Sequence, residues 1–168
     1  NADTFAANYE AFAAKVDALD AAMAEATATI PEEQRKLVTY HDAYAYFAVH
    51  YGFTVIGALQ PSSFDEPTPK DIGDLIEQIK AEGVKAIFGS EVFPSPVLEQ
   101  IGAETSVRYI DVLRDDDLVG EPGDAEHSWL GLMRFNFATM VEALGGDASS
   151  LNSVDVSDVV KDTAVYPQ

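Results

Sequence analysis

Cysteine is absent from this sequence of 168 residues, so disulfide bonds and thiolate metal sites are excluded. Histidine is scarce, with three residues, so any metal site must be completed by carboxylates. Basic residues are also few: 10 lysines and arginines stand against 29 aspartates and glutamates, a formal net charge of −19. A field of that sign repels phosphate backbones and anionic membrane surfaces. Nucleic acid is therefore not an expected partner.

Long apolar runs and enzyme motifs are missing as well. No stretch reaches eighteen uncharged apolar residues, so no membrane span is expected. Residues 1–20 carry charges throughout and do not read as a signal peptide, and a start directly in helical periodicity suggests a mature or trimmed chain. The sequence contains no GxSxG, no CxxC and no glycine-rich phosphate loop, so we do not expect an enzyme.

What the sequence does contain begins with one long amphipathic segment. Apolar side chains recur at spacings of four and three, which is typical of one helix face: Phe5, Tyr9, Phe12, Val16, Leu19 and Met23. The pattern predicts a helix over about residues 3–28, ended by Thr29-Ile30-Pro31. At 1.5 Å per residue its length is roughly 35–40 Å, and nothing in the sequence suggests a partner for all of it.

The rest of the chain alternates strand and helix signals. The predicted strands are 36–40, 53–59, 84–88 and 108–113, and the predicted helices are 42–51, 68–83, 96–103 and 125–144. Thr68 is the expected N-cap of the second of these helices and Asp42 a candidate cap of the first. This order predicts an α/β fold, with a four-stranded, mostly parallel sheet flanked by helices. The loop at 61–69 is rich in proline, and residues 145–168 are small, polar and acidic: a tail, a linker or a short helix.

Polar side chains follow three of the predicted strands. His41 follows the first, Ser90 and Glu91 the third, and Asp115–Asp117 the fourth. Ligands of parallel sheets bind beyond the carboxyl ends of the strands, so we expect these groups to converge on one edge.

Four stretches, in this order, carry a resemblance to a known family: KLVTYHDAYAYFAVHYGFTVIG, PTPKDIGDLIEQIKAEGVKAIFGSEVF, PSPVLEQIGAETSVRYIDVL and DDDLVGEPGDAEHSWLGLMRFNFATMVEAL. Over about residues 1–145 the chain resembles the C-terminal lobe of the metal-binding solute-binding proteins of ABC importers. These are periplasmic or lipid-anchored receptors for zinc and manganese that work with a membrane permease.

The resemblance implies two lobes joined by a rigid helix. Residues 1–30 resemble the second half of that linker helix, 31–145 the C-terminal α/β lobe, and 146–168 an acidic tail or terminal extension. The N-terminal lobe, with two histidine ligands, is not in this chain. The transported ligand implied is Zn²⁺ or Mn²⁺, and an extracytoplasmic location follows.

The resemblance also implies the metal ligands. The histidine of the first strand-to-helix turn is His41. An aspartate after the last strand falls on Asp117 when the alignment is anchored on Gly123 and on residues 133–136, which we favour. It falls on Asp116 when the acid-polar-leucine pattern is used. The family tends to place a glutamate where this chain has Ser90, so the role of Glu91, one place later, is open.

The other histidines have simpler interpretations. His50 lies nine residues past His41, half a helical turn off, and we expect it on the surface. His127 is expected in the first turn of the last helix, in a structural role. The apolar face of that helix, which includes Trp129, Leu132, Met133, Phe137 and Val141, is expected to be core packing.

Two functions from different classes remain open. The chain is either the metal-binding lobe of an import receptor, or an interaction or surface protein that keeps the lobe's fold without transport. In the second case the long helix should pair with another surface, such as a second copy in a homo-oligomer.

Overall fold

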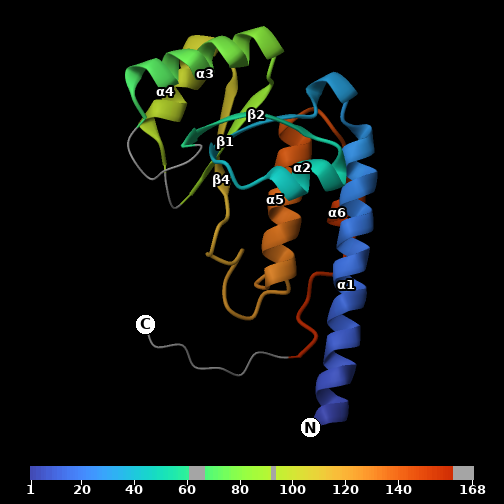
Figure 1. The fold of residues 1–168 in the computed structure, drawn as a ribbon. Coiled ribbons are helices and arrows are strands. Elements are labelled where there is room, and N and C mark those ends of the chain that lie inside the picture. The colour runs from blue at the N-terminus through green and yellow to red at the C-terminus, as the bar shows by residue number, and fades with distance from the viewer. Residues whose placement is uncertain (61–66, 92–93, 161–168) are drawn as a thin grey trace.

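The computed structural model describes residues 1–60, 67–91 and 94–160 (Figure 1). The predictions for 61–66, for the end of the second motif at 92–93 and for the last residues, 161–168, lie outside this part. The elements in chain order are α1 (Ala2–Thr29), η1 (Glu32–Gln34), β1 (Lys36–His41), α2 (Ala45–Tyr51), β2 (Thr54–Gln60), α3 (Pro69–Glu82), β3 (Ala86–Ser90), α4 (Pro96–Thr105), β4 (Arg108–Leu113), α5 (Trp129–Ala143) and α6 (Ser149–Asn152).

The four strands form one sheet in the order β2-β1-β3-β4, and every pair is parallel. The predicted α/β fold is therefore confirmed. Side chains of successive strand residues point to opposite faces. Leu37 and Phe88 face a core formed with α1, α5 and α6, whereas Val38 and Ile87 face a second core formed with α3 and α4. Figure 1 shows the same division, with α3 and α4 on one side and α1 and α5 on the other.

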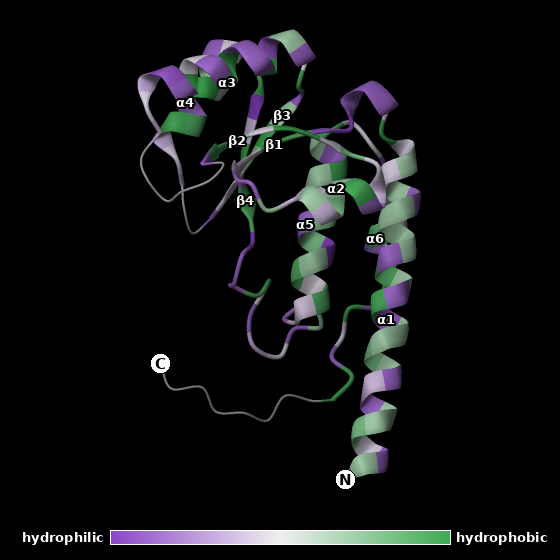
Figure 2. Ribbon diagram, in the orientation of Figure 1, coloured by the Kyte–Doolittle hydropathy of each residue, from purple (hydrophilic) through white to green (hydrophobic). Residues whose placement is uncertain are grey.

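Helix α1 has the predicted extent, but only half of its apolar stripe is covered. Leu19 and Met23 are buried in the first core, whereas Phe5 and Tyr9 are each 68% exposed. Figure 2 shows this apolar half of α1 extending beyond the end of α5. The prediction that Trp129 is a core residue is wrong. It is the first residue of α5, is 48% exposed, and contacts the stripe at Phe12, with ring centroids 5.9 Å apart.

The start of α3 agrees with the prediction, and the start of α2 does not. Thr68 caps α3 as expected: its hydroxyl accepts from the backbone N–H of Asp71, whose carboxylate accepts from the Thr68 N–H. Asp42 does not cap α2. The N–H of Ala43 donates to the carbonyl of His41 at 3.1 Å, so the chain first turns, and α2 begins only at Ala45.

The chain after α5 returns to α1. The short helix α6, one of the three alternatives for this segment, packs on α1, and Ser150 Oγ donates to the carbonyl of Ala22 at 3.0 Å. Leu151 and Val156 are buried in the first core. The division of the chain at 30 and 145 stays a prediction. Among the described helices, none is both long and apolar enough to cross a membrane.

Candidate metal site

A small cavity of about 130 Å³ opens at the carboxyl ends of β1, β3 and β4. Residues that follow or end these three strands line it together: His41, Ser90 and Asp115. The polar groups expected to converge on this edge are therefore brought to one place, with one residue contributed by each strand. Tyr44, the N-cap residue of α2, also lines the cavity.

His41 is the last residue of β1 and is half-buried. Its backbone is held on both sides. It pairs with Gln60 of β2, and its carbonyl accepts from the hydroxyl of Thr39 at 2.7 Å and from the N–H of Ala43. The ring of Tyr40 meets the imidazole edge-on, with centroids 4.6 Å apart. The strand end and its turn thus fix the position from which the imidazole reaches the cavity.

Asp115 is the carboxylate that the fold brings to this cavity. Leu113 and Asp115 line it, whereas Arg114 between them does not, which is the alternation of an extended chain. Burial raises the pKa of the Tyr44 hydroxyl, and the negative charge of Asp115 raises it further. Tyr44 therefore stays neutral at physiological pH, and the charge on this wall of the cavity is that of Asp115.

Asp116 and Asp117, the two aspartates that alignment selects, are placed differently. All three aspartates are exposed and share one bend, but of the three only Asp115 lines the cavity. Within 1–60, 67–91 and 94–160, no three His, Asp or Glu side chains lie close enough together to hold a metal ion. The cavity thus joins His41 and Asp115. Asp115 lies two residues after Leu113, the last residue of β4, and this spacing places both on the same side of an extended chain.

Glu91 remains outside this group. Its backbone N–H donates to the carbonyl of Leu113 at 3.1 Å, which extends the β3–β4 pairing. Both carboxylate oxygens are buried and have no hydrogen-bond partner among the described residues, while the preceding Ser90 lines the cavity. A buried, unpaired carboxylate costs free energy. Glu91 thus lies near this edge of the sheet without lining the cavity.

The other two histidines bond elsewhere. His50 Nε2 lies 2.7 Å from Asp20 of α1, and its side chain is 61% exposed, so the expected surface position is confirmed. His127 is not in the first turn of α5, because Ser128 is the N-cap and the helix starts after it. Its Nδ1 donates to the carbonyl of Val119 at 3.2 Å, a contact within the β4–α5 loop.

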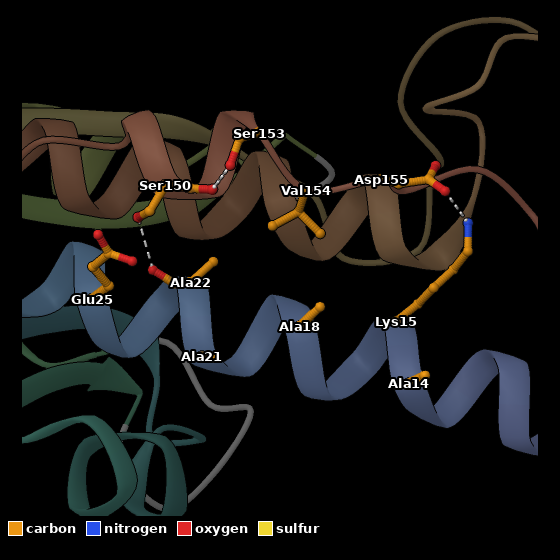
Figure 3. A pocket seen from close by; sticks show the side chains of 10 residues that line it. All are labelled: Ala14, Lys15, Ala18, Ala21, Ala22, Glu25, Ser150, Ser153, Val154 and Asp155. Atoms are coloured by element: carbon orange, nitrogen blue, oxygen red, sulfur yellow. Dashed lines mark hydrogen bonds and ion pairs between the residues drawn. The ribbon is translucent and has the colours of Figure 1, made fainter.

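A larger groove of about 600 Å³ lies between α1 and residues 150–155 (Figure 3). Alanines of α1 and two serines form most of its wall. Lys15 and Asp155 stand at one end and pair with each other. Unlike the smaller cavity, this groove has no histidine among the described residues that line it.

Known proteins resemble the chain over most of its length. The model of the family described as zinc-uptake complex component A, periplasmic, matches residues 1–143. The zinc-binding protein TroA of Treponema pallidum is 32% identical over 144 residues, 83% of this chain and 47% of that protein. The iron-binding protein YfeA of Yersinia pestis is 30% identical over 145 residues, 86% of this chain and 46% of that protein.

A solved structure and a third relative also match the chain. The periplasmic zinc-binding protein TroA of Treponema pallidum superposes with a TM-score of 0.70 at 33% identity, covering 81% of this chain and 50% of that one. The manganese-binding lipoprotein MntA of Bacillus subtilis is 32% identical over 148 residues, 86% of this chain and 48% of that protein. The chain spans about half the length of the relatives it matches.

Proposed function

Because the chain belongs to the family of zinc-uptake complex component A, we propose that it is the C-terminal, metal-binding lobe of an ABC importer's solute-binding protein. Its transported ligand is Zn²⁺ or Mn²⁺, its place is outside the cytoplasm, and its partners are the importer's permease and an N-terminal lobe. The observation that carries this proposal is the meeting of His41 and Asp115 in one cavity at the sheet edge. The family is one of transport receptors, and we propose no catalytic role.

The donor set fits such a cation. Imidazole nitrogen suits zinc and manganese, and carboxylate oxygen suits both. A zinc site is completed by four ligands, and the described residues that line this cavity include two such side chains. The relatives named above are about twice as long as the matched segment, so the remaining ligands belong to a second lobe. We therefore expect the 168-residue chain to bind metal weakly.

The aspartate ligand comes from residues 115–117. Asp115 is our first choice because it lines the cavity, whereas Asp116 and Asp117 rest on the alignment alternatives alone. A closed two-lobe receptor would bring new groups to this loop, so each aspartate needs its own variant. Helix α1, half covered and half exposed, fits the second half of a linker between two lobes.

Calorimetric titration with zinc and with manganese tests the proposal on the chain and on His41→Ala, Asp115→Asn, Asp116→Asn and Asp117→Asn. We expect a dissociation constant of about 1 µM or weaker, with binding lost in His41→Ala and in Asp115→Asn. His50→Ala is the matched control, because His50 bonds to Asp20 away from the cavity. Nanomolar zinc binding by this chain, or binding indifferent to His41, would contradict the proposal.

A second candidate is an interaction protein that keeps the lobe's fold. The exposed aromatic half of α1 favours it, because large exposed apolar surfaces are usually covered by a partner. Sedimentation equilibrium separates the two: a dimer that ignores metal and is broken by Tyr9→Ser supports the second candidate. A monomer that binds zinc through His41 supports the first.

A further inference from the structure

The side chain of Asn136, on α5, holds the backbone of a single residue of the β4–α5 loop. Its Oδ1 accepts from the N–H of Arg114 at 2.8 Å, and its Nδ2 donates to the carbonyl of the same residue at 2.8 Å. One amide thus satisfies both main-chain polar groups of Arg114. Both hydrogen bonds are part-buried, so water competes less well for these polar groups than it would at the surface.

These two hydrogen bonds continue, just past the end of β4, the kind of backbone pairing that a neighbouring strand would provide. β4 is an edge strand of the sheet, and an edge presents unpaired N–H and C=O groups. Arg114 stands immediately after the last residue of β4, and the Asn136 amide bonds to it as a neighbouring strand would. The guanidinium of Arg114 also lies over the ring of Phe135, 5.8 Å from its centroid. Both the backbone and the side chain of Arg114 are therefore fastened to α5.

Arg114 lies between two residues that line the cavity. Leu113 and Asp115 both line it, so fixing Arg114 fixes where the Asp115 backbone starts. Asp115 and the two aspartates after it are exposed. By contrast α5 is firmly packed, with Phe137, Met140 and Val141 buried in the first core. The amide thus ties an exposed turn to a rigid helix.

We infer that Asn136 is a positioning residue, which sets the place of Asp115 in the cavity that His41 also lines. For metal affinity the inference rests on the proposed function. The position of the loop itself does not depend on it. Residues that orient metal ligands typically contribute a factor of about 10–100 in metal affinity.

Two substitutions test this role. Asn136→Ala removes the amide, and Asn136→Leu removes its polar groups while keeping a side chain of similar size. Hydrogen exchange of the Arg114 amide, followed by NMR on the metal-free chain, reads the bond to Oδ1 directly. Zinc titration of the same variants reads the effect on the site. We expect faster exchange at Arg114 and zinc affinity about tenfold weaker in both variants.

Controls separate positioning from stability. Met140→Ala weakens the buried face of α5 without touching the amide, and Asn152→Ala removes an exposed asparagine of α6. Both should keep the wild-type exchange rate at Arg114 and the wild-type zinc affinity at a temperature where every variant is folded. A role confined to fold stability predicts instead that Met140→Ala loses as much affinity as Asn136→Ala.

The outcomes are distinct. Unchanged exchange at Arg114, zinc affinity equal to wild type while His41→Ala abolishes binding, or failure of both Asn136 variants to fold would each overturn the inference. If the wild type binds no zinc, the proposed function fails. Faster exchange at Arg114, together with shifted Asp115 resonances in both variants, would then still support the positioning of the loop.

Discussion

Lys15 of α1 and Asp155, near the end of the described chain, form an ion pair with Nζ 2.8 Å from Oδ2. The same ammonium group donates to the carbonyl and to the hydroxyl of Ser157, at 2.7 and 2.9 Å. Three bonds from one lysine therefore fasten the segment after α6 to the first helix, as Figure 3 shows for the ion pair. The segment's attachment should consequently depend on the charge of Asp155.

The first prediction concerns acid pH. The ion pair with Lys15, and then the bonds from Ser157, hold the pKa of Asp155 below its usual value of 3.8. A carboxylate with a lowered folded-state pKa contributes stability above the unfolded pKa and loses it as pH falls through the folded one. Asp155→Asn should lower the melting temperature slightly at pH 7, and its difference from wild type should shrink below about pH 4.

Thermal unfolding at several pH values checks this, with Asp158→Asn as the control. Asp158 is exposed and forms no ion pair with the described residues. A difference between Asp155→Asn and wild type that is as large at pH 2 as at pH 7 would show that the charge is not responsible.

The second prediction concerns the contact between α1 and α2. The hydroxyl of Tyr51 donates to Asp20 at 2.7 Å, and this bond is the main reason that the pKa of Asp20 is lowered. Tyr51→Phe keeps the ring contacts with Phe47 and Phe137 but removes the bond. It should reduce the free energy of unfolding by up to about 1 kcal/mol, since Asp20 is partly exposed. Urea denaturation measures this, and Tyr46→Phe, on the exposed face of α2, should change nothing.

The third prediction compares two ends of one stripe. Met23 has 0% exposure and Phe5 has 68%, although both belong to the same face of α1. Met23→Ala should cost about 2–5 kcal/mol in unfolding free energy through lost burial and a cavity. Phe5→Ala should stay within about 0.5 kcal/mol. Chemical denaturation of the two variants checks the contrast, and equal losses would mean that Phe5 is covered in solution.

The fourth prediction concerns the start of α5. A Cβ added to Gly131 would lie 2.0 Å from the carbonyl oxygen of Glu126, so the loop before α5 passes too close for any side chain. Gly131→Ala should cost about 1–3 kcal/mol by overpacking. Gly73, inside α3, has nothing within 4 Å of an added Cβ. Gly73→Ala should therefore stabilise the chain, by about 0.5–1 kcal/mol, in the same denaturation experiment.

The fold could be predicted well where its signals are local. The strand at 108–113 and the cap at Thr68 have their predicted positions, because alternation and capping depend on neighbours within a few residues. The parallel sheet follows from the order of elements alone. Trp129 could not be placed this way, because the exposure of the first residue of α5 depends on packing against distant elements such as α1.

The site could be predicted in part. The convergence of His41, Ser90 and the acidic turn on one edge follows from parallel topology. A shift in register of one residue after β4 would bring a different aspartate to the cavity. Motif alignment cannot distinguish the three consecutive aspartates of this turn. The backbone bonds between Arg114 and Asn136, from distant parts of the chain, decide that register. No local pattern reveals them.

The two cores differ in how much of the chain each one needs. The described buried residues of the second core, on the side of α3 and α4, all lie between Val38 and Ile101. Those of the first core, on the side of α1, extend from Leu19 to Val156. In the order of synthesis, the last buried residue of the second core, Ile101, is therefore made before the last buried residue of the first core, Val156. Until then the apolar stripe of α1 lacks the part of its cover that α5 and α6 supply, and such exposed surface promotes aggregation. Early association of nascent chains should therefore involve α1.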